Sequence, residues 1–521
     1  MNPADQAAVA AQGGEPRRIE MGSIATHDPS AFSESCVSLC RGGARLSAML
    51  TIPTPAGADV IALLLRDHEG RARLLRMQVA AGGEYPALTA HLPQAQAFER
   101  ELFEDHGIHP VGHPWLKPLR RHAELEGTVR EDRTVPSPGS GAAWPGPSPR
   151  ALRHPFLVVE GSDVHEVAVG PVHAGIIEPG HFRFECHGEE VLHLEIQLGY
   201  QHRGVEGLMT RSSEARRLVV AESVAGDSVI GHALAHCQVV ETLAGAEPPM
   251  RAQVLRGIAL ELERVANHVG DLGALCGDIG YLPGASYFGR LRGEFLNALM
   301  EISGNRFGRG LLVPGGVRFD IPEDVRRDLL ARLETVERDF HRTAELVFGT
   351  QSVLARFEGT GVLTEMAAEQ LGLVGPAARA SGCDRDVRRD HPSGVYRFAY
   401  IPPAVAADGD VLARALVRRL EVERSLTFVR EQLGALPEGP LRVPLGAPAG
   451  DCLAYSVVEG WRGECAHLAV TDAAGSVAGY RIVDASLHNW FGLALAMRGG
   501  QISDFPLCNK SFNLSYAGHD L

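Results

Sequence analysis

The sequence predicts an α+β fold, in which a small N-terminal α+β domain precedes a larger, mainly helical bundle with peripheral β-structure. Three observations support this prediction. Alternating apolar residues favour strands near the N-terminus, a proline- and glycine-rich linker follows, and long helical stripes dominate the rest of the chain. With 521 residues, of which 45% are hydrophobic and 22% charged, the chain can fill more than one core.

Residues 1–30 are the first segment, which is polar and rich in alanine, and we expect it to be flexible. Residues 31–133 form the expected small domain. We expect strands over residues 45–53 and 59–78, and helical structure over residues 85–92 and 94–106. Residues 134–150 form the linker, because their prolines remove backbone donors and their glycines raise the entropy cost of ordering.

Residues 151–521 form the second domain, which begins with a β-rich stretch over residues 164–198. Three apolar stripes with a spacing of three or four residues then predict long helices over residues 254–272, 325–340 and 412–433. The first of these helices follows Pro248 and Pro249, which suit a helix start. A last α+β portion has strand patterns over residues 453–458, 467–471 and 479–482, and then a helix over residues 489–498.

Composition excludes several classes of function. A formal net charge of −14 argues against a nucleic-acid partner, because phosphate binding needs a basic face. No apolar run approaches the roughly 20 residues of a membrane-spanning helix, and residues 1–18 lack the apolar core of a secretory signal. The nine cysteines include no Cys-x-x-Cys pair, which fits reduced thiols in a cytoplasmic protein. We therefore expect any membrane attachment to come through partner subunits.

Three motifs carry a resemblance to a known family. They are Gly-Pro-Val-His at 170–173 with Glu-Pro-Gly-His-Phe-Arg at 178–183, Leu-Gly-Tyr-Gln-His-Arg-Gly-Val-Glu at 198–206, and Glu-Leu-Glu-Arg-Val-Ala-Asn-His at 261–268. They resemble the 49-kDa subunit of respiratory complex I. The motif at 178–183 is more similar to the large subunit of nickel–iron hydrogenases of the formate hydrogenlyase type, which implies a helical bundle of the hydrogenase large-subunit kind.

The N-terminal domain separately resembles the 30-kDa subunit of complex I. The resemblance lies in Glu-Arg-Glu-Leu-Phe-Glu-Asp-His-Gly-Ile at 99–108 and Gly-His-Pro at 112–114. The order of the two parts is similar to a natural fusion of the 30-kDa and 49-kDa subunits, and it covers most of the chain.

The hydrogenase resemblance implies two cysteine pairs that hold nickel and iron, and this chain departs from both. The first pair falls at Ala225 and Ser228, and the second falls within residues 504–511, where Cys508 is the single cysteine. Soft metals prefer thiolate ligands, and one sulfur cannot hold a bridged centre that needs about four. We therefore expect no metal and no nickel–iron centre. The emptied pocket has as candidate residues Gly226, Ser228 and Cys508.

The complex I resemblance implies a quinone site. This chain keeps only some of the residues that form that site in the family. The family's headgroup histidine falls near Pro179, with His181 one step past the glycine, and its headgroup tyrosine falls at Gly226. The partner acid is retained as Asp278. A quinone is therefore the candidate acceptor, and we expect no cofactor held by this chain itself. The residues that we expect to line or tune the pocket are Asp278, His232, His181 and Arg203.

His232 and His236 lie four residues apart, which places both imidazoles on one face of a helix. With Cys237 or a carboxylate they could bind zinc, but the alternative is a buried helix whose histidines hydrogen-bond to their neighbours. A run of ionisable residues also leaves two interpretations open, a structural ion-pair network or a path that conveys charge. Its members are Arg203, Glu206, Arg264, His268, Asp278, Arg290 and Glu294.

The resemblance implies a function and a set of partners. The leading hypothesis is a peripheral electron-transfer subunit of a membrane-bound oxidoreductase related to complex I and to energy-converting hydrogenases. It would form the terminal redox pocket with a small iron–sulfur subunit like the 20-kDa subunit of complex I, and it would couple electron transfer to ion translocation. A ferredoxin-like iron–sulfur subunit and antiporter-like membrane subunits are the other implied partners, at the cytoplasmic, inner face of the cell membrane.

Two alternatives remain beside this hypothesis. One is an active nickel–iron hydrogenase large subunit with atypical ligands that include Cys508, and the other is a redox-silent scaffold of an ion transporter. The glycine-rich turn at residues 313–316 lacks the pattern of a phosphate-binding loop, so we expect no nucleotide site on this chain.

Overall fold

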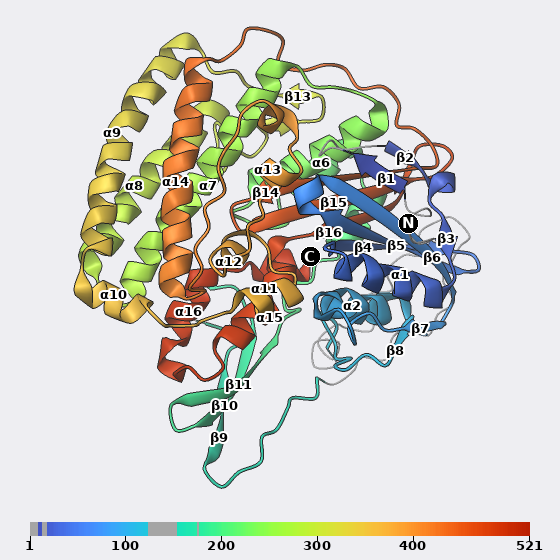
Figure 1. Ribbon diagram of the computed structural model, residues 1–521. Coiled ribbons are helices and arrows are strands. Elements are labelled where there is room, and N and C mark those ends of the chain that lie inside the picture. The colour runs from blue at the N-terminus through green and yellow to red at the C-terminus, as the bar shows by residue number, and fades with distance from the viewer. Residues whose placement is uncertain (1–8, 13–17, 123–153, 174–176) are drawn as a thin grey trace, which may run out of the picture.

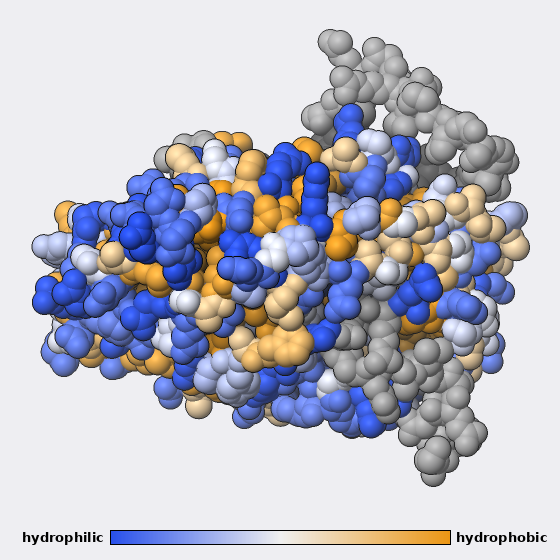
Figure 2. All heavy atoms as spheres, turned by 90° about the horizontal axis from the view of Figure 1, so that it is seen from above, coloured by the Kyte–Doolittle hydropathy of each residue, from blue (hydrophilic) through white to orange (hydrophobic). Residues whose placement is uncertain are grey.

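The computed structural model describes residues 9–12, 18–122, 154–173 and 177–521, so the predicted linker at 134–150 lies outside the described residues. The described residues form mixed helices and strands, which confirms the predicted α+β class (Figure 1). None of the described helices is long and apolar enough to cross a membrane. Figure 2 shows polar side chains over much of the face seen from above, as the acidic composition suggests.

The N-terminal part contains a five-stranded sheet with the order β1-β6-β5-β4, to which β3 adds in parallel beside β6. Its strands are β1 (Val9–Gln12), β3 (Thr26–His27), β4 (Arg45–Thr54), β5 (Gly57–Arg66) and β6 (Arg71–Ala80). The helices α1 (Pro29–Arg41) and α2 (Gln96–His106) and the short strands β7 (Glu84–Pro86) and β8 (His109–Val111) accompany the sheet. Asp28 caps α1, because its side chain accepts hydrogen bonds from the backbone N–H groups of Ser30 and Ala31.

Two local predictions for this part were wrong. Residues 18–20 form β2 (Arg18–Glu20), which pairs with a strand near the C-terminus, so the predicted flexible segment 1–30 is ordered there. Residues 85–92 are not helical, because the Glu99 carboxylate holds the backbone N–H groups of Leu88 and Thr89 in a turn. The strand structure predicted over residues 59–78 is confirmed as the two strands β5 and β6, because the chain turns at Gly70, where φ is 58°.

The second part opens with a three-stranded antiparallel sheet and continues as a helical bundle. The sheet contains β9 (Val164–Val169), β10 (His181–His187) and β11 (Glu190–Gln197). The helices are α4 (Val205–Arg211), α5 (Glu214–Ala221), α6 (Val229–Ala244), α7 (Met250–Asp278), α8 (Leu282–Ser303), α9 (Glu323–Phe348), α10 (Gln351–Phe357), α11 (Glu365–Gln370), α12 (Gly375–Arg379), α13 (Val387–Asp390) and α14 (Val411–Gly434). A small hairpin, β12 (Leu312–Val313) and β13 (Gly316–Val317), follows α8.

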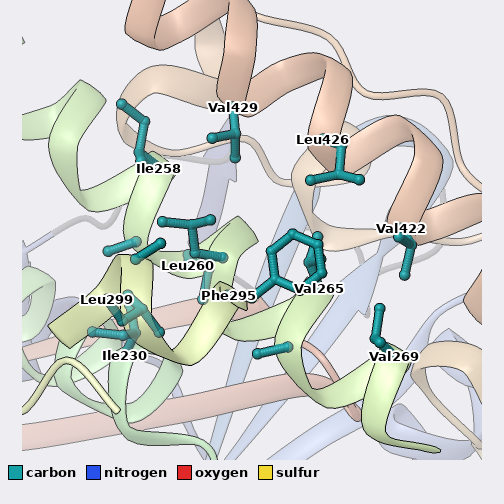
Figure 3. Close-up of a cluster of buried hydrophobic side chains, with 14 of the residues drawn as sticks. Ile230, Ile258, Leu260, Val265, Val269, Phe295, Leu299, Val422, Leu426 and Val429 are labelled. Atoms are coloured by element: carbon teal, nitrogen blue, oxygen red, sulfur yellow. The ribbon is translucent and has the colours of Figure 1, made fainter. Parts of the chain in front are cut away.

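The three predicted apolar stripes lie on α7, α9 and α14, which stand side by side with α8 in Figure 1. Their apolar faces fill the largest core cluster, and Figure 3 shows side chains of α6, α7, α8 and α14 converging in it. Val265, Val269, Val422 and Val429 are fully buried there. Burial of each such side chain contributes about 1.5–3 kcal/mol to the stability of the fold. This core therefore holds in place the helices whose ends border the site.

The C-terminal sheet joins the two halves of the chain. Its order is β16-β15-β14-β2, with β14 (Cys452–Gly460), β15 (Gly463–Thr471) and β16 (Val477–Val483). The helices α15 (Ala485–Ala496), α16 (Phe505–Phe512) and α17 (Tyr516–Asp520) follow. One buried apolar cluster contains Leu63 and Phe98 of the N-terminal part together with Leu453 and Leu468 of this sheet. The two halves therefore share a continuous core.

Candidate functional site

A cavity of about 740 Å³ lies where several segments of the second part meet. The loop before α6 contributes Gly226 and Asp227, the end of α7 contributes Asp278, the turn between β14 and β15 contributes Arg462, and α16 contributes Lys510. Much of the remaining wall is apolar, with the side chains of Val169, Ile177, Phe182, Phe307, Phe505 and Leu514. A cavity with apolar walls and a few convergent polar groups suits a small organic molecule.

Arg462 organises the polar side of this cavity. Its guanidinium donates two hydrogen bonds to the Asp227 carboxylate, at 2.5 and 2.8 Å, and one to the Ser228 hydroxyl at 3.2 Å. Its Nε donates to the carbonyl of Asn513 at 2.5 Å, and the group stacks over the ring of Trp461 at 3.9 Å. Burial opposes the charge of Arg462, but the Asp227 carboxylate outweighs it and raises the Arg462 pKa, so Arg462 is a fixed cation.

Two carboxyl groups at the cavity have raised pKa values. Burial raises the pKa of Asp278, and the charge of Lys510 opposes that rise. Burial likewise raises the pKa of Glu178, whose carboxylate accepts hydrogen bonds from the backbone N–H groups of Tyr516 and Ala517 at 3.1 and 3.3 Å. Carboxyl groups with raised pKa values beside cations are typical of sites that exchange protons with a bound molecule.

The side chains at this cavity do not fit a nickel–iron centre. Ala225 is buried and has no donor atom, and the Ser228 hydroxyl accepts a hydrogen bond from Arg462. Cys508 lies in an apolar cluster with Phe505 and Phe512, and burial raises its pKa to about 11, so its thiol keeps its proton at neutral pH. Among the cavity-lining residues that the structure describes there is no cysteine.

One buried trio in the described part of the chain places metal-binding atoms near one another. The ligand atoms of His232, Cys465 and Asp484 all lie within 4.8 Å. Both ring nitrogens of His232 are already engaged, however, with His467 and with Asp484, each at 3.0 Å. Burial also raises the pKa of Cys465 well above its usual value, so a metal would have to displace hydrogen bonds and a thiol proton.

The structure places only some of the predicted site residues at the cavity. Asp278 and Gly226 line it, and Ser228 reaches it through Arg462. His181 lies instead at the start of β10, where its ring packs against Phe156 with the ring centroids 5.4 Å apart.

The other predicted residues have different partners. Arg203 donates hydrogen bonds to the backbone carbonyls of Ser223, Val224 and Ala517, so it joins the loop before α6 to the C-terminal helix. His232 and Cys508 are buried outside the cavity lining. Sequence reasoning placed the polar segment 509–513, which contains Lys510, near the lost metal site, but it gave neither Lys510 nor Asp227 a role in the pocket.

Two members of the predicted ionisable run, Arg264 and His268, belong to a buried network of ion pairs and hydrogen bonds. Arg264 and His268 of α7 both contact the Glu421 carboxylate of α14, at 3.5 and 2.7 Å, and Arg379 contacts it at 2.5 Å. Their side chains are at most 1% exposed. Arg290 instead forms an exposed pair with Asp339. This arrangement favours the structural interpretation for Arg264 and His268.

Comparisons with known proteins agree with this architecture. Residues 278–449 match the family described as respiratory-chain NADH dehydrogenase, 49 Kd subunit, and residues 43–138 match the 30 Kd subunit. The chain is 31% identical to formate hydrogenlyase subunit 5 of Escherichia coli (strain K12), over 86% of this chain and 79% of that one. It is 32% identical to the carbon monoxide-induced hydrogenase of Rhodospirillum rubrum, over 67% and 97% of the two chains.

A solved structure is also similar. It belongs to the membrane-bound sulfane sulfur reductase, an archaeal respiratory membrane complex, and the similarity has a TM-score of 0.65 at 25% identity. The match covers 69% of this chain and 99% of the chain in that complex.

Proposed function

Because this chain belongs to the family of oxidoreductase subunits that includes formate hydrogenlyase subunit 5 and the carbon monoxide-induced hydrogenase, we propose that its cavity is the terminal redox pocket of a membrane-bound, complex-I-like assembly. The chain is the peripheral electron-transfer subunit of that assembly. A ferredoxin-like subunit passes electrons to a small iron–sulfur subunit, which passes them to the cavity. Antiporter-like membrane subunits use the released energy. The assembly lies at the cytoplasmic face of the cell membrane.

One observation carries this proposal: the cavity keeps about 740 Å³ and a set of paired ionisable groups although the thiolate ligands are replaced. The aromatic rings of Phe182, Phe307 and Phe505 suit a flat ring, and Asp278 with Lys510 supplies a proton and a positive charge. A quinone fits these walls. Its reduction takes two electrons from the iron–sulfur partner and two protons from groups such as Asp278.

Asp278→Asn in the intact membrane complex tests this proposal. Asparagine keeps the size of the side chain but cannot deliver a proton, so we expect the rate of acceptor reduction to fall about 100-fold or more. Co-purification of the partner subunits measures assembly, which should be unchanged. Asp339→Asn, on the exposed surface of α9, is the matched control and should keep the wild-type rate.

Two outcomes would contradict the role of Asp278, namely a wild-type rate in Asp278→Asn or loss of assembly in that variant. A complex that oxidises no donor but still translocates ions would support a redox-silent scaffold instead.

Nickel content separates the proposal from an active hydrogenase. Because Cys508 is a buried, protonated thiol outside the cavity lining, we expect freshly isolated complex to hold far less than about one nickel per chain. Elemental analysis by mass spectrometry gives this ratio, and a value near one would revive the hydrogenase with atypical ligands.

A further inference from the structure

A continuous chain of hydrogen-bonded side chains runs along one face of α6, outside the cavity lining. His232 and His236 contribute from α6, and the other members come from α5, β15, β16 and the residue that caps α15. In order, the contacts are Asp484 Oδ2 to His232 Nε2 at 3.0 Å, His232 Nδ1 to His467 Nε2 at 3.0 Å, His467 Nδ1 to Tyr480 Oη at 3.0 Å, Tyr480 Oη to His236 Nδ1 at 2.8 Å, and His236 Nε2 to Glu214 Oε1 at 3.0 Å.

The chain is buried along its length and reaches solvent at one end. The three histidines are fully buried, and Tyr480 and Asp484 are 5% and 1% exposed. The Glu214 side chain at the other end is 41% exposed. A buried path that opens to water at a carboxylate has the layout of a proton pathway, because each imidazole and the phenol can both donate and accept a proton.

The number of protons in this chain is set by its hydrogen bonds. Its five contacts require five protons, whereas three neutral imidazoles and one phenol hold four. With both carboxyl groups ionised, the chain is therefore fully hydrogen-bonded only when it carries one extra proton. A sixth proton would leave one contact with two donors, and removal of the fifth would leave one contact with none.

The surrounding charges limit where the extra proton can lie. Burial opposes ionisation of Asp484 and Glu214, but hydrogen bonds from His232 and His236 outweigh it and hold the pKa of each carboxyl group below its usual range. Burial lowers the pKa of His467 well below its usual value and raises that of Tyr480 well above, so both are neutral. The extra proton therefore belongs to His232 or to His236.

These two states differ only in the direction of the central hydrogen bonds. With the proton on His232, that ring donates to His467, His467 donates to Tyr480, and Tyr480 donates to His236. With the proton on His236, each of these three protons lies at the opposite end of its own hydrogen bond. Exchange between the states moves a positive charge by about 6 Å along α6 without moving any heavy atom far.

The charge of a cavity-lining residue acts on Asp484, at the inner end of the chain. The guanidinium of Arg462, which lines the cavity, contributes to the lowered pKa of Asp484. Near the other groups of the chain lie the neutral thiol of Cys465, 3.9 Å from His232 Nε2, and Arg217, 3.3 Å from Glu214. Negative charge added in the cavity would attract the extra proton toward His232.

We propose that Asp484, His232, His467, Tyr480, His236 and Glu214 form a proton relay that moves a positive charge between His236, which contacts Glu214 at the surface, and His232, on the side of the cavity. The relay rests on the proposed function, because it compensates the charge that reduction places in the cavity. Only N–H and O–H bonds form and break in it, and each proton that leaves one atom binds the next.

Tyr480→Phe tests the relay, because it removes the one hydroxyl that joins the two halves and keeps the ring. We expect turnover of the membrane complex to fall about ten-fold or more. Tyr396→Phe is the matched control, since Tyr396 is also buried and its hydroxyl also donates to a buried carboxylate, that of Glu261. It should keep near-wild-type turnover. Equal rates in the two variants would overturn the relay.

A second measurement does not depend on turnover. The measurement uses the full-length protein with ¹⁵N-labelled histidine. If the two states exchange, the ring-nitrogen NMR signals of His232 and His236 should lie between the positions of the imidazolium and the neutral ring. In Tyr480→Phe one ring should become fully protonated and the other neutral. Fixed limiting signals already present in the wild type would overturn the relay, whereas a wild-type complex without turnover would contradict only the proposed function.

Discussion

Glu421→Ala is expected to destabilise the protein by about 3–5 kcal/mol, because it leaves buried cations without their shared counter-ion. The Glu421 carboxylate contacts Arg379 at 2.5 Å, His268 at 2.7 Å and Arg264 at 3.5 Å, and its side chain is 1% exposed. Arg264 keeps Glu261 and Arg379 keeps Glu459 as a buried partner, but each loses the attraction of the Glu421 carboxylate, which acts against folding. Chemical denaturation of the purified chain measures the change in the free energy of unfolding.

An exposed ion pair provides the control for this prediction. Arg290 and Asp339 lie 2.6 Å apart, but their side chains are 52% and 36% exposed. We expect Asp339→Ala to change the free energy of unfolding by less than about 1 kcal/mol. If Glu421→Ala were as mild, the carboxylates of Glu261 and Glu459 would be sufficient counter-ions for Arg264 and Arg379.

The buried network also bears on the cavity. Arg264 donates hydrogen bonds to the backbone carbonyls of Glu459 and Gly460, at 2.6 and 2.9 Å, and these residues lead into the turn that carries Arg462. The network therefore joins α7 and α14 to the segment that forms the polar wall of the cavity. Arg264 therefore positions the segment that leads to the site, and it does not line the cavity itself.

The long helices could be predicted from the sequence because their signal is local. Apolar residues repeat every three or four positions along α7, α9 and α14, and each repeat buries a face of the same helix. The strand β2 has no such signal, because it is three residues long and its partner β14 lies at the other end of the chain. The turn at residues 87–92 depends likewise on Glu99, which belongs to a later helix.

At the site, too, local features could be predicted from the sequence and contacts between distant residues could not. Asp278 and Gly226 were found because family motifs mark their positions, but the ion pair of Asp227 with Arg462 joins residues 235 positions apart. The spacing of His232 and His236 predicted a shared helix face. It could not reveal that partners from β15 and β16 would complete a chain of hydrogen bonds between them.

Glu263→Gln is expected to change how stability depends on pH. Glu263 is buried on α7, and its carboxyl oxygens accept hydrogen bonds from the backbone N–H groups of Ile230 and Gly231 at the start of α6, at 2.7 and 3.1 Å. Burial raises the pKa of Glu263 to about 8, although these N–H groups oppose the rise. In the unfolded chain the group loses its proton near pH 4.5, its ordinary value.

The sign of the effect follows from these two pKa values. Below the unfolded pKa both states hold the proton, and the stabilising contribution of Glu263 is complete. As the pH rises toward about 8, only the unfolded state releases its proton, so the wild type loses up to about 4 kcal/mol between about pH 5 and about pH 8. Glutamine has no proton to lose. Chemical denaturation of the wild type and of Glu263→Gln at both pH values gives their free energies of unfolding. The wild type should lose stability relative to Glu263→Gln as the pH rises.

The control for this shift is Glu334→Gln on the exposed surface of α9, where the side chain meets solvent in the folded and the unfolded state alike. Its stability difference from the wild type should not change between the two pH values. A constant difference for Glu263→Gln would mean that the two N–H donors of α6 outweigh burial. Glu263 would then be an ionised cap of the helix that carries His232 and His236, and its negative charge would stabilise the extra proton beside it.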